Sequence, residues 1–520
     1  MNPDVDGPHT VGRWLRDRAA SNPAKIAIDD RGVALDYATL ARRAELLAQR
    51  LTDAGYGPGQ RIATVSGNSA DHVVAFFACA FLGIAFIPLS WRLTPTELAE
   101  LVRRSDPVLV LVEDEYVALA GAALRMLGDD APAYVFLGST GVETDVPVAT
   151  ESAAQRAVRD DDPLLVIFTS GSEAAPKGVV LTHANCFWTN MALSQAMPMV
   201  PTDVVLAMLP HYHVAAWNVQ PLLAWWTGAT VVLERSFQPS RVLQLICDRR
   251  VTTMMGVPTQ YRMLQETAGW ADADLSSLRH VLVGGATMPV DLAEVWSARG
   301  VALTQGYGLT EAGPNVLALP ASELASHPGA VGRPYPSVDV RLVDVATSLP
   351  LEGVATGELW VRGPSTFSGY LDDPVATDRA RSDGWLRSGD LAHRDADGIY
   401  RIVDRLKEIY VSGGENVAPA EIERALSEHP LVKAVAVVGA PDAVWGERGV
   451  AFVVAREALS ADELLAFARD RLAAFKLPAR IVFLDELPRS TIEKVARARL
   501  RAMAAQLTAR REEDADDRVR

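Results

Sequence analysis

The stretch from residue 164 to residue 183 constrains this chain most, because a small-residue loop directly follows a buried-strand pattern. It reads L-L-V-I-F-T-S-G-S-E-A-A-P-K-G-V-V-L-T-H. The apolar run 164–168 has the length and composition of a strand. Small residues at 169–172 then allow backbone amides and hydroxyls to converge on an anion, and Lys177 adds a positive charge. The pattern predicts a phosphate-binding loop, although a Ser/Gly-rich turn between two strands has a similar composition.

This loop differs from the phosphate loop of nucleotide triphosphatases, G-x-x-x-x-G-K-[ST]. Pro176 stands where the second glycine is required, and Gly178 stands where the hydroxyl residue is required. A different phosphate-handling family is therefore expected.

Composition limits the classes of partner. The chain has 520 residues, of which 49% are hydrophobic and 22% are charged, so we expect a soluble globular protein of at least two domains. The net charge of −15 argues against nucleic acid and against an anionic membrane surface. No secretory signal is visible at residues 1–6. The three cysteines, Cys79, Cys186 and Cys247, are far apart and are interpreted as core residues, which predicts a reducing, cytoplasmic location.

An uncharged stretch at residues 73–89 has nearly the length of a membrane span. Gly83 and Pro88 interrupt it. We therefore predict a buried helix that runs into a buried strand, and no transmembrane anchor.

Strand and helix patterns alternate along most of the chain. Strands are expected at residues 61–66, 109–113 and 133–137, each beside a helical segment, which favours a layered α/β architecture with parallel sheets. Beyond residue 404, strands near 434–438 and 449–454 and helices at 419–427 and 461–473 indicate a compact α+β domain.

Two further segments each join a strand pattern to a glycine turn. They are V-L-V-G-G-A-T-M-P at residues 281–289 and T-Q-G-Y-G-L-T-E-A-G at residues 304–313. Glycines at a strand end let a planar ring and its phosphates approach the backbone.

In order and spacing, these segments resemble the motifs of the adenylate-forming superfamily, which includes acyl-CoA synthetases, luciferases and the adenylation domains of peptide synthetases. The loop resembles T-S-G-[ST]-[TE]-G-x-P-K-G-V, with Ala174 in place of a glycine. Further segments resemble P-x-[FH]-H at residues 210–213, Y-G-x-T-E at 307–311, W-x-x-[ST]-G-D at 385–390 and L-P-[RK]-[TS]-x-[TS]-G-K-[IV] at 487–495. Glu493 replaces the usual glycine of the last motif. The resemblance covers residues 37–500.

The resemblance implies an α/β fold: a large layered α/β N-terminal domain with a small β-barrel subdomain, and a smaller mobile α+β C-terminal domain. We place the ATP- and acid-binding adenylation domain at residues 1–403 and the mobile domain at 404–520, with the hinge at Lys407. The segment 508–520 consists mainly of charged residues and is predicted to be a disordered tail.

The resemblance also implies the roles of individual residues. Tyr307 would stack on adenine, Thr310 would hold phosphate oxygens and Glu311 would bind Mg²⁺. The expected catalytic residues are Lys177, His213, Thr310, Glu311 and Lys494. The expected ATP- and AMP-binding residues are Thr169, Ser170, Gly171, Ser172, Lys177, Gly285, Ala286, Thr287, Gly306, Tyr307, Gly308, Leu309, Thr310, Asp390 on the ribose hydroxyls, Arg405 on ribose or phosphate, and Lys494.

The sequence indicates less about the acid-binding pocket. By resemblance it would be lined by His213, Val214, Trp217, Gly284, Gly285 and Gly308. No Asp or Glu lies between His211 and Thr227, so the ammonium group of an amino-acid substrate would lack a partner there. Several Trp and Met residues on nearby segments favour a large apolar acid, fatty, aryl or polycyclic, but such residues fit an ordinary core equally well.

The function implied is that of an ATP-dependent acyl-CoA ligase that uses Mg²⁺, with CoA as cosubstrate. An acid would attack the α-phosphorus of ATP, and a thiol would then attack the acyl-adenylate. Rotation about Lys407 would expose the CoA-binding residues Ser412, Gly413 and Gly414. Alternatives are an enzyme that loads a carrier-protein phosphopantetheine, a non-catalytic nucleotide-binding protein and a luciferase-like oxygenase. The oligomeric state stays open, with a homodimer as one option.

Overall fold

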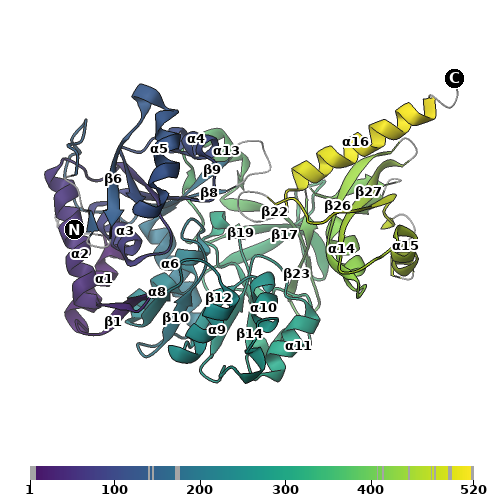
Figure 1. Cartoon of the computed structure of the whole chain (residues 1–520), viewed down its shortest axis with the longest axis horizontal. Helices are drawn as coiled ribbons and strands as arrows, with labels where there is room; N and C mark the ends of the chain where they lie inside the picture. Colours follow the sequence, from purple (N-terminus) through teal and green to yellow (C-terminus); the bar gives the residue numbers. More distant parts are fainter. Residues whose placement is uncertain are drawn as a thin grey trace. The chain divides into compact units, whose positions relative to one another are not determined.

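The computed structural model divides by its internal contacts into two compact units. Unit 1 comprises Met1–Arg341, Trp360–Ser388 and Asp397–Tyr400, and unit 2 comprises Leu342–Leu359, Gly389–Ala396 and Arg401–Arg520. Figure 1 colours the chain along its sequence. The structure describes residues 7–138, 141–142, 146–169, 176–406, 408–412, 415–442, 445–469, 471–472, 476–489 and 495–516.

A nine-stranded sheet in unit 1 has the order β16-β15-β14-β13-β12-β10-β11-β1-β2. Its six central strands, from β14 to β1, run parallel, and β2, β15 and β16 pair antiparallel at the edges. The strands are β1 (Ile26–Asp30), β2 (Val33–Asp36), β10 (Val204–Ala207), β11 (Thr230–Leu233), β12 (Thr253–Gly256), β13 (His280–Val283), β14 (Leu303–Tyr307), β15 (Leu317–Leu319) and β16 (Arg333–Pro334).

A second sheet of unit 1 has eight strands in the order β20-β9-β8-β4-β3-β5-β6-β7. Its parallel part contains the three strands predicted from the sequence, here β3, β5 and β6. The strands are β3 (Arg61–Val65), β4 (Ala85–Leu89), β5 (Leu109–Glu113), β6 (Ala133–Gly138), β7 (Gly141–Val142), β8 (Pro163–Thr169), β9 (Lys177–Thr182) and β20 (Gly369–Tyr370).

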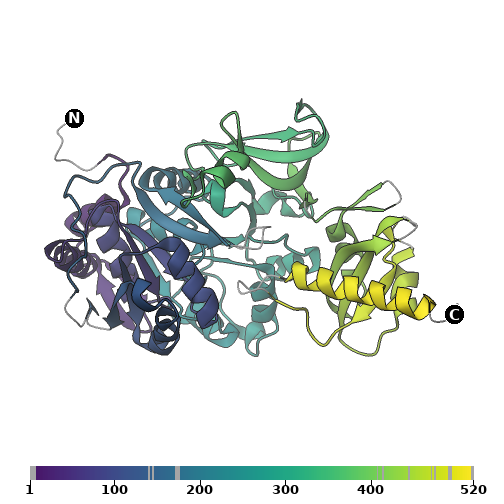
Figure 2. The same ribbon diagram turned by 90° about the horizontal axis from the view of Figure 1, so that it is seen from above.

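Helices cover both sheets in layers (Figures 1 and 2). Helix α3 (Ala70–Leu82) contacts α1 (Val11–Ser21) and α2 (Tyr37–Asp53) and strands of both sheets, so it lies between them. Helices α4 (Pro95–Ser105) and α5 (Val117–Arg125) pack on the eight-stranded sheet. Helices α9 (Pro239–Asp248), α10 (Pro258–Gln265) and α11 (Val290–Ala298) pack on the nine-stranded sheet. The predicted layered architecture is confirmed.

The uncharged stretch 73–89 is a buried helix followed by a buried strand, as predicted. Helix α3 begins at the N-cap Ser69, whose side chain accepts a hydrogen bond from the backbone N–H of His72, and ends at Gly83 with φ 64°. Strand β4 follows, and all five of its residues are buried. Of the helices in the described part of the chain, none combines the length and the apolar character needed to cross a membrane.

Two of the three cysteines lie in the core, as predicted. Cys79 and Cys186 are buried, and burial raises the pKa of the Cys186 thiol to about 12. Cys247 differs from the prediction, because it lies near the end of the surface helix α9 and is partly exposed.

A third sheet has the order β18-β17-β19-β22-β21, with β23 beside β22. The division between the two units passes through it. Its strands are β17 (Asp339–Val343), β18 (Pro350–Leu351), β19 (Ala355–Arg362), β21 (Arg381–Ser382), β22 (Trp385–Arg394) and β23 (Tyr400–Arg405).

The C-terminal part of unit 2 is an α+β fold, in agreement with the prediction. Its sheet has the order β25-β24-β27-β26, with β28 beside β27. Because side chains alternate along a strand, Val437 packs on one face with α14 and α15, and Val438 packs on the other with α16. The elements are β24 (Tyr410–Ser412), β25 (Glu415–Val417), α14 (Pro419–Ser427), β26 (Val432–Asp442), β27 (Gly446–Ala455), α15 (Ala461–Arg469), β28 (Arg480–Phe483) and α16 (Arg497–Asp516). Helix α16 includes part of the segment 508–520.

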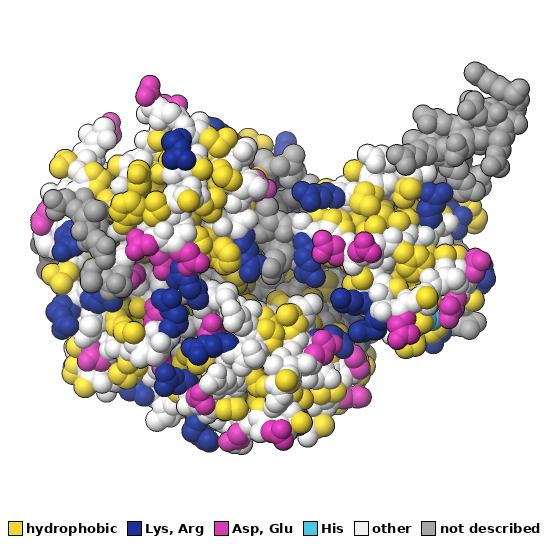
Figure 3. Space-filling model, in the orientation of Figure 1, with side chains coloured by type: hydrophobic (Ala, Val, Ile, Leu, Met, Phe, Trp, Pro, Cys, Tyr) yellow, Lys and Arg dark blue, Asp and Glu magenta, His cyan; other side chains and the backbone are white. Residues whose placement is uncertain are grey.

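Charged side chains of both signs are spread over the visible face of the molecule. Figure 3 shows dark-blue Lys and Arg side chains interspersed with magenta Asp and Glu side chains among the described residues. On this face the charge is therefore distributed rather than gathered into one basic surface.

Candidate active site

The two ends of the predicted phosphate loop lie side by side. Strand β8 ends at Thr169 and strand β9 begins at Lys177, and the antiparallel register pairs these two residues. The expected site residues Ser170, Gly171, Ser172, Lys407, Gly413, Gly414 and Lys494 lie outside the described residues.

The two glycine turns meet at the carboxyl ends of two neighbouring strands in the nine-stranded sheet. Strands β13 and β14 are parallel neighbours, with Val283 opposite Gln305. Their carboxyl ends therefore bring residues 284–287 close to residues 306–310. Ligands of open α/β sheets bind at this end of the strands. The structure thus brings together the expected ATP-binding residues Gly285, Ala286, Thr287, Gly306, Tyr307, Gly308, Leu309 and Thr310.

Gln305 joins these two turns and was not singled out from the sequence. Its side chain is nearly fully buried, at 2% exposure. The amide Nε2 donates to the carbonyl oxygens of Val283 and Ala286, at 3.3 and 3.1 Å, while Oε1 accepts from the N–H of Met288 at 2.8 Å. The side chain therefore holds the first turn against the second strand. A Gln between the strand pattern and the glycine turn was the signal available in the sequence.

Close packing explains the glycine at position 308. A Cβ atom there would lie 1.4 Å from the carbonyl oxygen of Pro314, so no side chain fits without moving the backbone. Gly285 has a φ of 75°, a left-handed conformation that favours glycine. Each turn therefore has a position, Gly285 or Gly308, where the backbone carries no side chain.

Glu311, Tyr370 and Lys177 form a contact group. Glu311 lies in the 3₁₀ turn Thr310–Ala312, and its Oε1 accepts a hydrogen bond of 2.9 Å from the Tyr370 hydroxyl. The Nζ atom of Lys177 lies 5.3 Å from the centre of the Tyr370 ring. The sequence predicted roles for Lys177 and Glu311. It assigned none to Tyr370, although the Gly-Tyr pair lies between two recognised motifs.

The donor set fits Mg²⁺ bound together with a nucleotide. Among the described residues there is no cluster of three or more His, Cys, Asp or Glu that could hold a metal ion without other ligands. Mg²⁺ is usually held by one or two carboxylates together with substrate phosphates. A single carboxylate such as that of Glu311, beside two backbone turns suited to phosphate, matches this requirement.

The ribose-binding candidates pair with each other within unit 2. The Nε atom of Arg405 lies 2.8 Å from Oδ1 of Asp390, whose side chain is 3% exposed. Leu406 donates its N–H to the carbonyl oxygen of Gly389 at 2.9 Å, which ties β23 to β22 at this point. The structure therefore joins two motifs that the sequence separates.

Ser412 is the one expected CoA-binding residue that the structure describes. It ends β24 and is 1% exposed, and its Oγ atom has no hydrogen-bond partner. Its role in CoA binding stays a prediction.

The segment after Leu209 places the acid-pocket candidates beside a buried aromatic cluster. His213 donates its N–H to the carbonyl oxygen of Pro210 at 3.0 Å and so closes the predicted turn. The ring of Trp217 is fully buried and stacks on Phe76 with their centres 4.5 Å apart. The ring of Trp217 thus packs in the core, and its contribution to an acid pocket stays a prediction, as do those of His213, Val214 and Gly284.

A buried histidine pair adjoins this cluster. The Nδ1 atoms of His72 and His211 lie 3.0 Å apart, and Nε2 of His72 lies 2.7 Å from Oγ1 of Thr64. Burial lowers the pKa of His72 to about 3 and lowers that of His211 in the same direction. Both rings are therefore neutral at physiological pH, and only one of the two facing nitrogens carries a proton. Sequence reasoning did not pair these residues, which are 139 positions apart.

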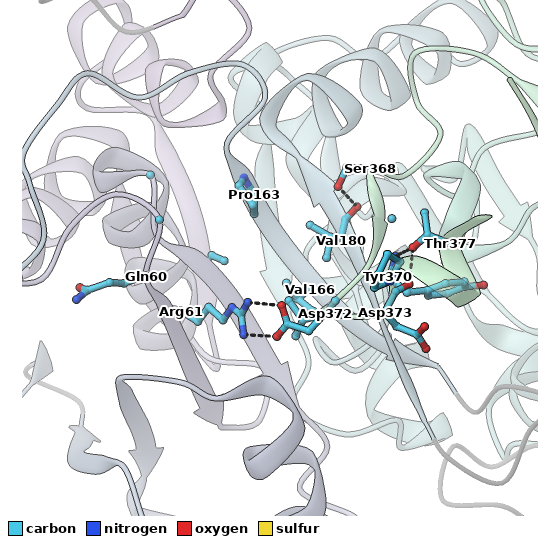
Figure 4. Close-up of a pocket in the computed structure, with 16 residues that line it drawn as sticks. Gln60, Arg61, Pro163, Val166, Val180, Ser368, Tyr370, Asp372, Asp373 and Thr377 are labelled. Carbon is cyan, nitrogen blue, oxygen red and sulfur yellow. Dashed lines mark hydrogen bonds and ion pairs between the residues drawn. The ribbon is translucent and has the colours of Figure 1, made fainter. Parts of the chain in front are cut away.

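A pocket of about 410 Å³ lies at the amino ends of parallel strands in the eight-stranded sheet (Figure 4). It is lined by Arg61, Ala85 and Pro163, which begin the parallel strands β3, β4 and β8, and by the segment 368–374. None of the expected site residues lines it. Because ligands of α/β sheets bind at the carboxyl ends of the strands, this pocket is not the candidate active site.

The chain matches two protein families. The model of the AMP-binding enzyme family matches residues 15–371, and that of the AMP-binding enzyme C-terminal domain matches residues 421–494.

The matches to named relatives cover nearly the whole chain. A feruloyl-CoA synthase of Amycolatopsis sp is 38% identical over 94% of this chain and 98% of its own length. A fatty acid–[acyl-carrier-protein] ligase of Streptomyces coeruleorubidus is 34% identical over 93% of this chain and 94% of its own length.

The o-succinylbenzoate CoA synthetase of Bacillus subtilis has a similar structure. Its complex with the acyl-adenylate intermediate has a TM-score of 0.82 at 27% identity and covers 94% of this chain and 97% of that one. Its complex with ATP and magnesium has a TM-score of 0.84, again at 27% identity, and covers 94% and 98%.

The chain therefore belongs to the AMP-binding enzyme family. It is an enzyme of the acid–thiol ligase class.

Proposed function

We propose that this enzyme activates a hydrophobic carboxylic acid, fatty, aryl or polycyclic, as an acyl-adenylate and then transfers the acyl group to CoA. ATP, Mg²⁺ and CoA are its cosubstrates and cofactor. The observation that carries the proposal is that two glycine turns meet at the ends of β13 and β14, beside Glu311. Tyr370 contacts both Glu311 and Lys177, so Lys177 lies near these turns as well. An aryl acid is favoured by the feruloyl-CoA synthase relative.

In the first step the carboxylate oxygen attacks the α-phosphorus of ATP and pyrophosphate leaves, so negative charge builds on the phosphoryl oxygens. Lys177 and Thr310 stabilise that charge by their positions, and Lys494 does so from the C-terminal domain. Glu311 holds Mg²⁺, which supplies positive charge to the triphosphate when bound. Asp390 and Arg405 orient the ribose, and His213 lies beside the reacting carboxylate.

In the second step the CoA thiol attacks the acyl-adenylate carbonyl and AMP leaves. A free thiol has a pKa of about 8.5, so modest stabilisation of the thiolate is enough. Lys494 has to vacate the site for the thiol. The domain 404–520 therefore rotates about Lys407 relative to the domain 1–403, and Ser412, Gly413 and Gly414 then approach CoA.

A panel of carboxylic acids assayed for acid-dependent pyrophosphate release tests the proposal, with the CoA thioester detected by mass spectrometry. We expect release with at least one aryl, fatty or polycyclic acid and formation of the matching thioester. Failure of every acid to release pyrophosphate contradicts the proposal and favours a non-catalytic nucleotide-binding protein.

The division of labour between the two steps has its own test. We expect Lys494→Ala to abolish pyrophosphate release while it leaves transfer from a supplied acyl-adenylate to CoA largely intact. Lys433→Ala, an exposed lysine of the same domain, is the matched control and retains both steps. Equal loss of both steps in the Lys494 variant contradicts this division.

A second candidate acceptor is the phosphopantetheine of a carrier protein. The relative named as a fatty acid–[acyl-carrier-protein] ligase favours it. Parallel assays with CoA and with a phosphopantetheinylated carrier protein separate the two acceptors, since the true acceptor gives the higher kcat/KM.

A further inference from the structure

Tyr370 contacts two charged side chains of the proposed chemistry. One is Glu311, assigned to the metal, and the other is Lys177, assigned to the phosphates. We propose that Tyr370 is a positioning residue that orients the Glu311 carboxylate for Mg·ATP and holds the Lys177 ammonium group near the phosphates. The inference deepens the proposed function and rests on it for the roles of Glu311 and Lys177. What it adds is that the Glu311 carboxylate and the Lys177 ammonium group both depend on one tyrosine.

The hydroxyl group orients the carboxylate. A glutamate side chain has several rotatable bonds, so a free carboxylate samples many directions. The Tyr370 hydroxyl donates to Oε1 of Glu311 at 2.9 Å, which removes much of the rotation about the last bond. An ionised carboxylate has about four acceptor sites. One is used by the phenol, and the others remain for a cation and its waters.

The ring acts on the lysine. Nζ of Lys177 lies 5.3 Å from the ring centre, within the range of about 6 Å over which an ammonium group is attracted to an aromatic face. Lys177 is the first residue of β9, directly after the phosphate loop, so a small change in its side-chain direction moves the charge relative to the loop. The hydroxyl and the ring therefore have separable roles.

The backbone around Tyr370 is well anchored. The two-residue strand β20 pairs with β9, with Tyr370 opposite Val179. The Tyr370 N–H donates to Oγ1 of Thr377 at 2.8 Å, and the N–H of Phe367 donates to the carbonyl oxygen of Glu311 at 2.8 Å. The segment carrying Tyr370 is thus hydrogen-bonded both to the strand of Lys177 and to the turn of Glu311.

An ion pair holds the other side of the same segment. Arg61 donates two hydrogen bonds to Asp372, at 2.7 and 2.9 Å, across the 410 Å³ pocket (Figure 4). In Figure 4 the Tyr370 side chain lies on the side of the segment away from Gln60 and Arg61. The Tyr370 ring also packs against Phe367 with their centres 5.0 Å apart, so ring packing and the hydrogen bond to Glu311 together fix where the tyrosine points.

Two variants of Tyr370 separate the hydroxyl from the ring, and a third variant is the control. Tyr370→Phe removes the hydroxyl and keeps the ring, and Tyr370→Leu removes both. The matched control is Tyr37→Phe, which removes a buried tyrosine hydroxyl that donates to the carbonyl oxygen of Ala229 at 2.6 Å, far along the chain from the site. Each protein is titrated calorimetrically without any acid, first with Mg·ATP and then with ATP in EDTA, so that no turnover occurs.

For Tyr370→Phe we expect roughly tenfold weaker Mg·ATP binding, with binding of metal-free ATP unchanged, because only the metal ligand is disordered. For Tyr370→Leu we expect weaker binding of both forms, because Lys177 is also released. The control binds both forms as the wild type does. A Tyr370→Phe variant that binds Mg·ATP like the wild type, or that loses both forms equally, overturns the proposal.

The same titrations distinguish this inference from the proposed function. A wild-type protein that binds Mg·ATP but releases no pyrophosphate with any acid refutes the ligase function, while the variants still report on Tyr370. A wild-type protein that binds metal-free ATP and Mg·ATP with equal affinity overturns the role of Glu311 and with it the role of Tyr370.

Discussion

Acid is expected to destabilise unit 1 through the buried histidine pair. His72 and His211 are each 1% exposed, and their facing Nδ1 atoms are 3.0 Å apart. Protonating both rings would place two positive charges at that distance in a dry interior. The rings therefore stay neutral in the folded protein, while in the unfolded chain histidine takes up a proton near pH 6.5.

The direction and the magnitude of this loss of stability follow from proton linkage. Because the folded pKa of His72 is lowered to about 3, the unfolded chain binds more protons than the folded protein between pH 3 and pH 6.5. Stability is full above about pH 6.5 and falls as the pH drops below that value. At pH 5.0 the loss from His72 is about 2 kcal/mol, at about 1.4 kcal/mol per pH unit. The lowered pKa of His211 adds to this loss.

Urea unfolding at pH 7.5 and pH 5.0, followed by circular dichroism, measures the effect. We compare the wild type with the double variant His72→Gln/His211→Gln, which removes both titrating rings, so that every carboxylate contributes equally to the two proteins. The matched control is Phe76→Leu, which alters the same aromatic cluster without a titrating group.

The wild type should lose at least about 2 kcal/mol more than the double variant between the two pH values. The penalty of Phe76→Leu should be the same at both. Equal pH dependence in the wild type and the double variant would refute the reasoning, because it would mean that the folded rings accept protons as readily as the unfolded ones.

Two further predictions concern ion pairs of unit 2. Arg497→Met removes the partner of the largely buried Glu423, to which two guanidinium nitrogens bond at 2.9 Å, so the C-terminal domain should lose about 2 kcal/mol in urea unfolding. The control is Arg471→Met, which breaks the exposed pair of Arg471 with Glu428 and should cost less than about 1 kcal/mol; equal costs would contradict this. Asp390→Asn deletes the buried partner of Arg405 and should raise the KM for ATP about tenfold with little change in the KM for the acid; an unchanged KM for ATP in steady-state kinetics would remove Asp390 from the nucleotide site.

Local patterns in the sequence predicted strands of the sheets and the segments that border the candidate active site. The apolar run before Thr169 and the glycine turns after residues 283 and 305 were recognisable because strand composition and conformational freedom are properties of short segments. The motif resemblance then placed Glu311 and Lys177 in one site. Sequence reasoning did not assign the burial of Trp217 within four other rings, since core and pocket residues have the same composition.

The sequence by itself determined the family, the layered α/β class and the chemical types of the site residues. Only the tertiary structure decided which residues meet. Tyr370 and Glu311 are 59 positions apart, and Arg61 and Asp372 are 311 apart. Such pairs exist because β20 joins the edge of the eight-stranded sheet beside β9. Strand order is set by long-range packing, which no local pattern encodes, and so the partners of Glu311 and Lys177 became visible only in the folded chain.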